Sequence, residues 1–72
     1  MDIGAAVKAM REGSRVARRG WNGENMYLKL RRPSSLDELL YVYICTMHGN
    51  AVPWTCSQTD LLADDWTVVT NV

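Results

Sequence analysis

Residues 41–47 read Tyr-Val-Tyr-Ile-Cys-Thr-Met, a run of β-branched and aromatic side chains that is typical of a β-strand. The residues His48-Gly49-Asn50 follow as a turn, and residues 51–55 are predicted to return antiparallel to the first strand. Pro53 has no N–H to donate to a ladder, so the returning strand has to lie at a sheet edge or carry a bulge. This stretch predicts a β-hairpin within an antiparallel sheet.

The segment before this hairpin predicts two more strands. Residues 14–18 read as a strand with Val16 pointing inward and its arginines pointing outward. Residues 26–31 alternate between apolar and polar side chains, which is the period of a half-buried strand. The turn former Asn22-Gly23 lies in the loop between the two strands, and residues 36–39 fit a helical turn.

The first residues predict a short amphipathic helix. Asp2 is a good N-cap, and Gly13 supplies a left-handed stop. Four apolar residues between them fall at helical spacing, namely Ile3, Ala6, Val7 and Met10. We expect the face formed by Ile3, Val7 and Met10 to pack on the sheet face that bears Leu28 and Leu30.

The last third of the chain predicts a short helix and a final strand. Residues 57–60 fit a capping box ahead of the apolar residues 61–63, and residues 66–69 are rich in β-formers. The predicted fold class is α+β, with residues 1–72 forming a single domain. One N-terminal helix packs on a small antiparallel sheet of four or five strands.

Length and composition restrict the class of protein. The chain has 72 residues, of which 47% are hydrophobic and 22% charged, as expected of a small folded domain. Its longest apolar run, residues 39–45, is much shorter than the roughly 20 residues of a membrane span, and its start does not resemble a secretory signal. We therefore expect a cytoplasmic protein, and an oligomer, since so short a chain buries only about 60% of its unfolded surface.

The charges are divided between the two halves of the chain. All eight basic residues lie in residues 1–32, and residues 33–72 carry five acids and no base. The net charge of zero argues against binding to duplex nucleic acid. One interpretation is that the halves form ion pairs with each other; another is a cationic pocket for a nucleotide phosphate around Arg15, Arg18 and Arg19.

No arrangement typical of an enzyme or a metal site is found. Cys45 and Cys56 lack a second cysteine pair, so a tetrahedral zinc site is not expected, and both are interpreted as packing residues. Nothing evident orients a dyad of Cys45 and His48. The acids in residues 60–65 are explained by a helix cap and a turn, so the sequence predicts no catalytic residue, metal or cofactor.

Three tryptophans are an excess in so short a chain. Trp21 and Trp54 stand beside turn-forming or proline residues rather than inside an apolar stripe. Each of these two rings either closes the small core or forms a stacking platform for a nucleobase, and the sequence leaves both interpretations open. For Trp66 the core is favoured.

Two blocks of sequence resemble a known family. The first runs from Glu12-Gly13 through Val16-Ala17-Arg18-Arg19-Gly20-Trp21-Asn22-Gly23 to Met26-Tyr27-Leu28. The second comprises Val52-Pro53-Trp54 and the segment from Ser57-Gln58-Thr59-Asp60 through Leu61-Leu62-Ala63-Asp64-Asp65-Trp66. Together they cover roughly half of the chain, and they resemble the signatures of the phage Thoeris anti-defence family, type-two branch.

The resemblance implies a helix packed on an antiparallel sheet with a projecting β-hairpin, assembled as a homotetramer, with a dimer as the second choice. It implies a protein that is not an enzyme. Such a protein binds cyclic nucleotide immune signals, glycocyclic ADP-ribose or cyclic dinucleotides, in the host cytosol and sequesters them without degrading them. The defence system countered would be Thoeris or CBASS.

The resemblance also implies which residues lie near the ligand. The residues are carried over by motif, and the neighbouring arginines are expected to face phosphates. They are Arg18, Arg19, Trp21, Asn22, Gly23, Met26, Trp54, Ser57, Gln58, Thr59 and Asp60. The segment between Pro33 and Pro53 is shorter than the family pattern, which predicts a reduced distal hairpin.

Two other functions stay open: a protein-binding module that uses Tyr41, Tyr43 and Met47, and a hydrolase acting on the same nucleotides.

Overall fold

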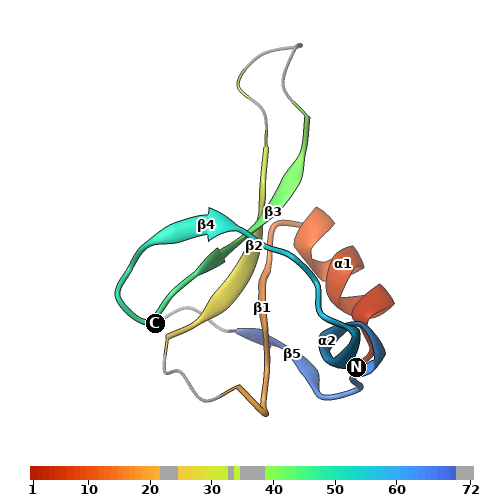
Figure 1. The fold of residues 1–72 in the computed structure, drawn as a ribbon. Coiled ribbons are helices and arrows are strands. Elements are labelled where there is room, and N and C mark those ends of the chain that lie inside the picture. The colour runs from red at the N-terminus through yellow and green to blue at the C-terminus, as the bar shows by residue number, and fades with distance from the viewer. Residues whose placement is uncertain (22–24, 33, 35–38, 70–72) are drawn as a thin grey trace.

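The computed structural model describes residues 1–21, 25–32, 34 and 39–69, and it confirms the α+β class (Figure 1). The elements along the chain are α1 (Ile3–Arg11), β1 (Arg15–Arg18), β2 (Tyr27–Arg31), β3 (Tyr41–Cys45), β4 (Ala51–Pro53), α2 (Gln58–Leu62) and β5 (Trp66–Val69). The predicted turn at Asn22-Gly23 and the predicted helical turn at residues 36–39 lie at or within the segments outside the described residues.

The strands form one antiparallel sheet in the order β4-β3-β2-β1-β5. The hairpin of β2 and β3 projects beyond the other strands, and α1 covers one face of the sheet (Figure 1). Strand β5 returns from the far end of the chain to pair with β1 at the other edge. The projecting hairpin and the N-terminal helix of the prediction are therefore both present.

The strand register sorts side chains onto two faces. Val16 is paired with Leu28 on one side and Val68 on the other, and Leu28 is paired in turn with Ile44. Because directly opposed residues point to the same side of a sheet, these residues form an apolar row on the face toward α1. The residues between them in sequence, such as Tyr27, point to the opposite face.

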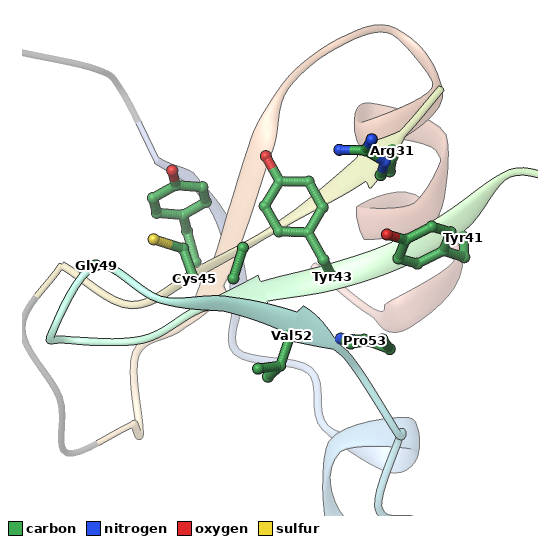
Figure 2. Close-up of a pocket in the computed structure, with 9 residues that line it drawn as sticks. Arg31, Tyr41, Tyr43, Cys45, Gly49, Val52 and Pro53 are labelled. Carbon is green, nitrogen blue, oxygen red and sulfur yellow. The ribbon is translucent and has the colours of Figure 1, made fainter. Parts of the chain in front are cut away.

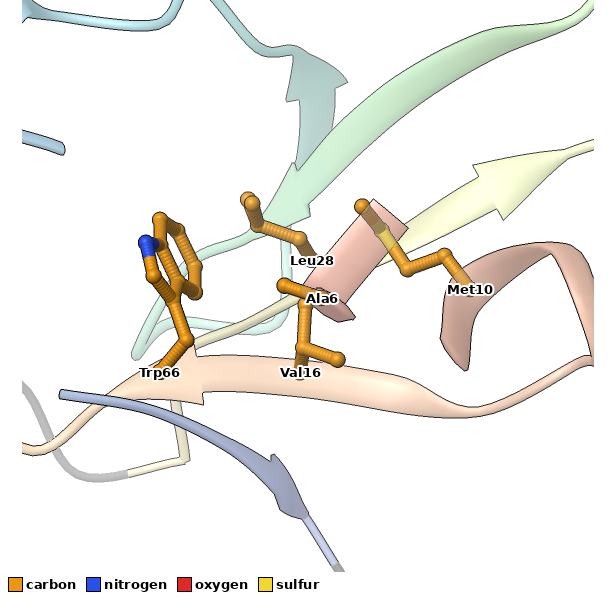
Figure 3. Close-up of a cluster of buried hydrophobic side chains, with 5 residues drawn as sticks. All are labelled: Ala6, Met10, Val16, Leu28 and Trp66. Carbon is orange, nitrogen blue, oxygen red and sulfur yellow. The ribbon is translucent and has the colours of Figure 1, made fainter. Parts of the chain in front are cut away.

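The core lies between α1 and this apolar row. Its buried members point toward one another in Figure 3 and are Ala6, Met10, Val16, Leu28 and Trp66. Partly buried side chains pack around them, Leu30 and Ile44 among them. The predicted contact between the helix and the Leu28 and Leu30 face is therefore confirmed for the sheet side.

On the helix side the prediction was wrong for Val7, which is 37% exposed. Each residue of an α-helix is rotated by about 100° from the one before it. With Ala6 and Met10 pointing straight at the sheet, Val7 lies on the flank of the helix. Ile3 packs against the core as predicted, and Ala9 joins it in place of Val7.

Both helices begin at the predicted caps. The side chain of Asp2 accepts a hydrogen bond from the Ala5 N–H at 2.9 Å, and Ser57 accepts one from the Asp60 N–H at 3.1 Å. After α1 the chain turns through Gly13, whose φ of 97° lies in the left-handed region that favours glycine. No helix in the described part of the chain is long and apolar enough to span a membrane.

The second hairpin is shorter than predicted. Strand β3 ends at Cys45, and the turn is closed by hydrogen bonds from Thr46 N to Asn50 O at 2.8 Å and from Gly49 N to Thr46 O at 2.9 Å. Strand β4 ends at Pro53 and lies at the sheet edge, as the missing N–H of proline requires. The prediction of packing cysteines was wrong for Cys56, which is exposed, whereas Cys45 is half-buried.

Candidate functional site

The three tryptophans come together at one end of the core. The Trp66 ring is buried, and Trp21 and Trp54 each meet it edge to face. The ring centroids are 5.4 Å apart for Trp21 and 6.0 Å apart for Trp54, within the usual range for aromatic pairs. Trp21 and Trp54 are both half-buried, so each ring packs on the core and keeps part of its surface toward solvent.

Arg18 ends β1 beside these rings, and its side chain is held by two carboxylates. Its Nε donates to Asp65 Oδ1 at 2.7 Å, and its Nη1 donates to Asp60 Oδ1 at 2.8 Å. Only 17% of the side chain is exposed. The prediction that the β1 arginines point outward was therefore wrong for Arg18, because the register places it opposite Trp66 on the α1 face.

The same two carboxylates fix the chain that follows β1. Asp60 Oδ1 also accepts from Trp21 Nε1 at 3.3 Å, and Asp65 Oδ2 accepts from the Gly20 N–H at 3.0 Å. The Trp66 indole donates to the Asp60 carbonyl oxygen at 3.0 Å. We give the name Trp–Asp cluster to the three tryptophans, the two acids and the arginine that meet here: Arg18, Trp21, Trp54, Asp60, Asp65 and Trp66.

The hydrogen bonds keep both acids ionised. Burial opposes the charge of Asp60, but the hydrogen bonds from Arg18, Trp21 and Ser57 outweigh it and lower the pKa of this carboxyl. The hydrogen bond from Arg18, aided by the Gly20 N–H and opposed by burial, lowers the pKa of Asp65. The hydrogen bonds to Asp65 and Asp60 raise the pKa of Arg18, so the cluster contains one cation and two anions.

The structure joins only some of the predicted site residues. Arg18, Trp21, Trp54 and Asp60 belong to the Trp–Asp cluster, and the Ser57 hydroxyl caps the helix that carries Asp60. Arg19, Gln58 and Thr59 are exposed nearby in sequence, and Met26 is half-buried. Asn22 and Gly23 lie outside the described residues.

Sequence reasoning missed Asp65 as a partner of Arg18 and Gly20. The Asp64-Asp65 pair was attributed to the turn after α2, which explains Asp64 but leaves out the contacts of Asp65 with β1. The available signal was the division of charge between the halves of the chain. The interpretation of that division as internal ion pairing is confirmed for Arg18.

The cluster presents two half-buried indole rings, Trp21 and Trp54, packed edge to face on Trp66. Within the described residues no group of three or more His, Cys, Asp or Glu side chains is placed to hold a metal ion. Desolvation, followed by the charge of Asp60, raises the pKa of the nearby Cys56 thiol, which disfavours the nucleophilic thiolate. An aromatic platform with fixed orientation is the feature that remains.

The fold and this cluster define a class of small α+β proteins, in which a helix covers one face of a five-stranded antiparallel sheet and an aromatic platform closes one end. The chain belongs to the Thoeris anti-defense 2-like domain family, whose model matches residues 1–69. It is also 33% identical to Thoeris anti-defense 2 of Bacillus phage SP01, with 96% of this chain and 94% of that protein covered. The resemblance seen in the sequence is thus confirmed.

Membership in this family makes the protein a phage anti-defence protein. The alignment with the Bacillus phage protein extends over 84 residues, more than the 72 of this chain, so the relative carries residues that this chain lacks. That the shortening falls between Pro33 and Pro53 stays a prediction.

Proposed function

We propose that the protein binds a cyclic nucleotide immune signal at the Trp–Asp cluster and sequesters it without chemical change. The family assignment supports the signal as the class of ligand, because the relative's name identifies it as an antagonist of Thoeris defence. Glycocyclic ADP-ribose is the first candidate, and cyclic dinucleotides are the second.

The observation that carries the proposal is the fixed orientation of Trp21. Its indole N–H is bound to Asp60, and its ring packs against Trp66 at an interplanar angle of 79°. A half-buried indole held in this way is ordered before the ligand arrives, which lowers the entropic cost of binding. Stacking of a base on such a ring is worth about 1–3 kcal/mol.

Some polar side chains near the cluster already have hydrogen-bond partners within the protein, so we assign the polar contacts of the ligand to neighbouring exposed side chains. All three guanidinium nitrogens of Arg18 donate to carboxylates, so in this proposal Arg19, which is exposed, faces the phosphates. Ser57 is engaged as a helix cap. The exposed side chains of Gln58 and Thr59 then supply the hydrogen bonds that orient the ligand.

Titration of the purified protein with glycocyclic ADP-ribose and with a cyclic dinucleotide tests this function. We expect saturable binding and recovery of the intact nucleotide by chromatography. Altered nucleotide after incubation would instead establish the hydrolase alternative. The absence of binding to either nucleotide, together with capture of a protein partner through Tyr41, Tyr43 and Met47, would establish the protein-binding alternative.

The variant Trp21→Ala tests the placement of the ligand. We expect affinity to fall about tenfold or more, because a stacking contact is lost. Trp21→Phe keeps a stacking ring but removes the N–H that binds Asp60, so its loss of affinity is expected to be smaller. Leu62→Ala, at a position that is 80% exposed on α2, is the control for a surface change.

Unchanged affinity in a folded Trp21→Ala protein would place the ligand elsewhere. Thermal unfolding of each variant separates this outcome from loss of the fold, since Trp21 also packs on the core.

A further inference from the structure

The turn that carries Trp21 into the Trp–Asp cluster is anchored by Asp65. Residues 18–21 form a tight turn, closed by the Trp21 N–H, which donates to the Arg18 carbonyl oxygen at 3.2 Å. The Arg19 N–H donates to the Asp65 carbonyl oxygen at 3.2 Å, and the Gly20 N–H donates to Asp65 Oδ2 at 3.0 Å. With the bond from Arg18 Nε at 2.7 Å, all three residues that precede Trp21 are bound to Asp65.

The fit between the turn and Asp65 is close at Gly20. A Cβ atom at this position would lie 3.1 Å from Asp65 Oδ2 and 3.5 Å from Arg18 Nη2. The carboxylate therefore occupies space that a side chain at position 20 would need, and glycine allows it to reach the backbone N–H. The path of the chain into Trp21 is thus set by contact with Asp65.

Asp60 and Asp65 hold Trp21 in different ways. Asp60 binds the indole N–H directly, but at 3.3 Å this bond is longer than the usual value of about 2.9–3.0 Å for an N–H donor. Asp65 holds the turn instead, through shorter bonds to Arg18 at 2.7 Å and to Gly20 at 3.0 Å. The better-made anchor therefore acts on the main chain that carries the ring.

We propose that Asp65 is a positioning residue of the ligand site, which holds the Trp21 ring in place by fixing the turn of residues 18–21. Asp65 then raises the affinity for the ligand without touching it, because a ring that is already in place loses less conformational freedom on binding. The effect on affinity rests on the function proposed for the Trp–Asp cluster, whereas the position of the ring can be measured without a ligand.

A hollow on the other face of the sheet supplies a comparison. Figure 2 shows this hollow of about 320 Å³, which Tyr43 and Cys45 help to line. Its lining includes neither Trp21 nor Asp65. A ligand held in the hollow would depend on Tyr43 and be indifferent to the turn, so Tyr43→Ala distinguishes the two surfaces.

Indole NMR signals of the ligand-free full chain test the position of the ring. The chain has three tryptophans, and Trp21→Phe assigns the Trp21 signal by its loss. We expect Asp65→Ala to shift this signal and to speed its exchange with solvent, because the bond to Asp60 depends on where the turn lies. The Trp66 indole, which donates to the Asp60 carbonyl oxygen, should keep its slow exchange.

The matched control is Asp64→Ala, which removes a carboxylate of the same charge from the adjacent, exposed position. It should leave the Trp21 signal in place. A Trp21 signal that is unchanged in Asp65→Ala would overturn the proposal. Equal acceleration of exchange at all three indoles would also overturn it, because that result would show that Asp65 stabilises the fold as a whole.

Titration of the same variants with glycocyclic ADP-ribose and with a cyclic dinucleotide tests the effect on affinity. We expect Asp65→Ala to weaken binding about three- to tenfold, the cost of ordering a side chain on binding. Because Asp65 acts through Trp21, the losses should not add, and the double variant should bind no more weakly than Trp21→Ala alone. Circular dichroism at the titration temperature establishes that each variant is folded.

Additive losses, or unchanged affinity in a folded Asp65→Ala protein that still needs Trp21, would overturn the role of Asp65 and leave the proposed function intact. Binding that Tyr43→Ala weakens and that neither Trp21→Ala nor Asp65→Ala changes would place the ligand in the hollow and overturn both. A parent protein that binds neither nucleotide would contradict the proposed function and, with it, any effect of Asp65 on affinity. The NMR comparison alone then decides whether Asp65 positions the Trp21 ring.

Discussion

A single carboxylate oxygen organises the Trp–Asp cluster. Asp60 Oδ1 accepts from Arg18 at 2.8 Å and from Trp21 at 3.3 Å, and so ties α2 both to the end of β1 and to the loop that follows it. Asp65 makes the second connection, to Arg18 and to the Gly20 N–H. Arg18 is partly buried and donates to both carboxylates, so removal of either acid takes away an acceptor from its N–H groups.

The pH dependence of stability follows from these acids. The folded protein lowers the pKa of Asp60 and of Asp65, so it binds their protons less readily than the unfolded chain does. Their contribution is fully present above the unfolded pKa of about 3.9 and is lost as the pH falls through the lowered folded values. We expect the free energy of unfolding of Asp65→Asn to fall less steeply than that of the parent between about pH 5 and pH 3.

Urea denaturation followed by circular dichroism at each pH measures this slope. Asp64→Asn removes the same charge from the adjacent, exposed position and is the matched control for loss of a negative charge. Parallel slopes for Asp65→Asn and the parent would show that Asp65 has no lowered pKa in the folded protein.

Single residues were the hardest feature to predict from the sequence. The partners of Arg18 lie 42 and 47 residues away, and no local pattern specifies contacts across that separation. The helix caps were predicted correctly, because Asp2 and Ser57 each bond to a backbone N–H three residues ahead. For Trp21 and Trp54 the sequence left the core and an exposed platform open, and half-burial gives each ring a part in the core.

At the scale of elements, the helix α1 shows what periodicity leaves undetermined. Four apolar residues within one wide stripe are compatible with more than one rotation of the helix on the sheet. The sheet contacts select the rotation that buries Ala6 and Met10, and Val7 then faces partly outward. The alternation in β2 was predicted better, because a period of two assigns each residue of a strand to one face; in β1 the same period puts Arg18 on the face of Val16, which the prediction missed.

Two substitutions in α1 measure this rotation. Met10→Ala removes a side chain that is 1% exposed, and we expect it to lower the free energy of unfolding by about 2–4 kcal/mol through lost burial and a cavity. Val7→Ala, at 37% exposure, should cost less than about 1 kcal/mol, helped by the higher helix propensity of alanine. Chemical denaturation of both variants gives the comparison, and equal losses would contradict the orientation described for α1.

At the scale of the whole molecule, the sequence predicted an antiparallel sheet and the hairpin of β3 and β4 within it, because the signals for these were local. The turn at residues 48–50 predicts that β4 returns antiparallel to β3, and Pro53 predicts that β4 lies at an edge or carries a bulge. The pairing of β5 with β1 joins distant segments and had no such signal. This pairing is what brings Trp66 and Asp65 to Arg18, so the candidate site depends on the part of the topology that was least predictable.

The size of the core bears on assembly. In the described part of the chain only six hydrophobic residues are buried, two of them alanines, whereas Leu39, Met47 and Leu62 are each more than half exposed. So small a core stabilises a monomer weakly, and burial of the exposed apolar side chains between copies would add to this stability.

We propose a homotetramer, with a dimer as the second choice. Light scattering at micromolar concentration should give a multiple of the 8.1 kDa chain, and the unfolding temperature should rise with protein concentration, because association stabilises by mass action. A mass of 8.1 kDa with a concentration-independent unfolding temperature would show that the lone chain is sufficient.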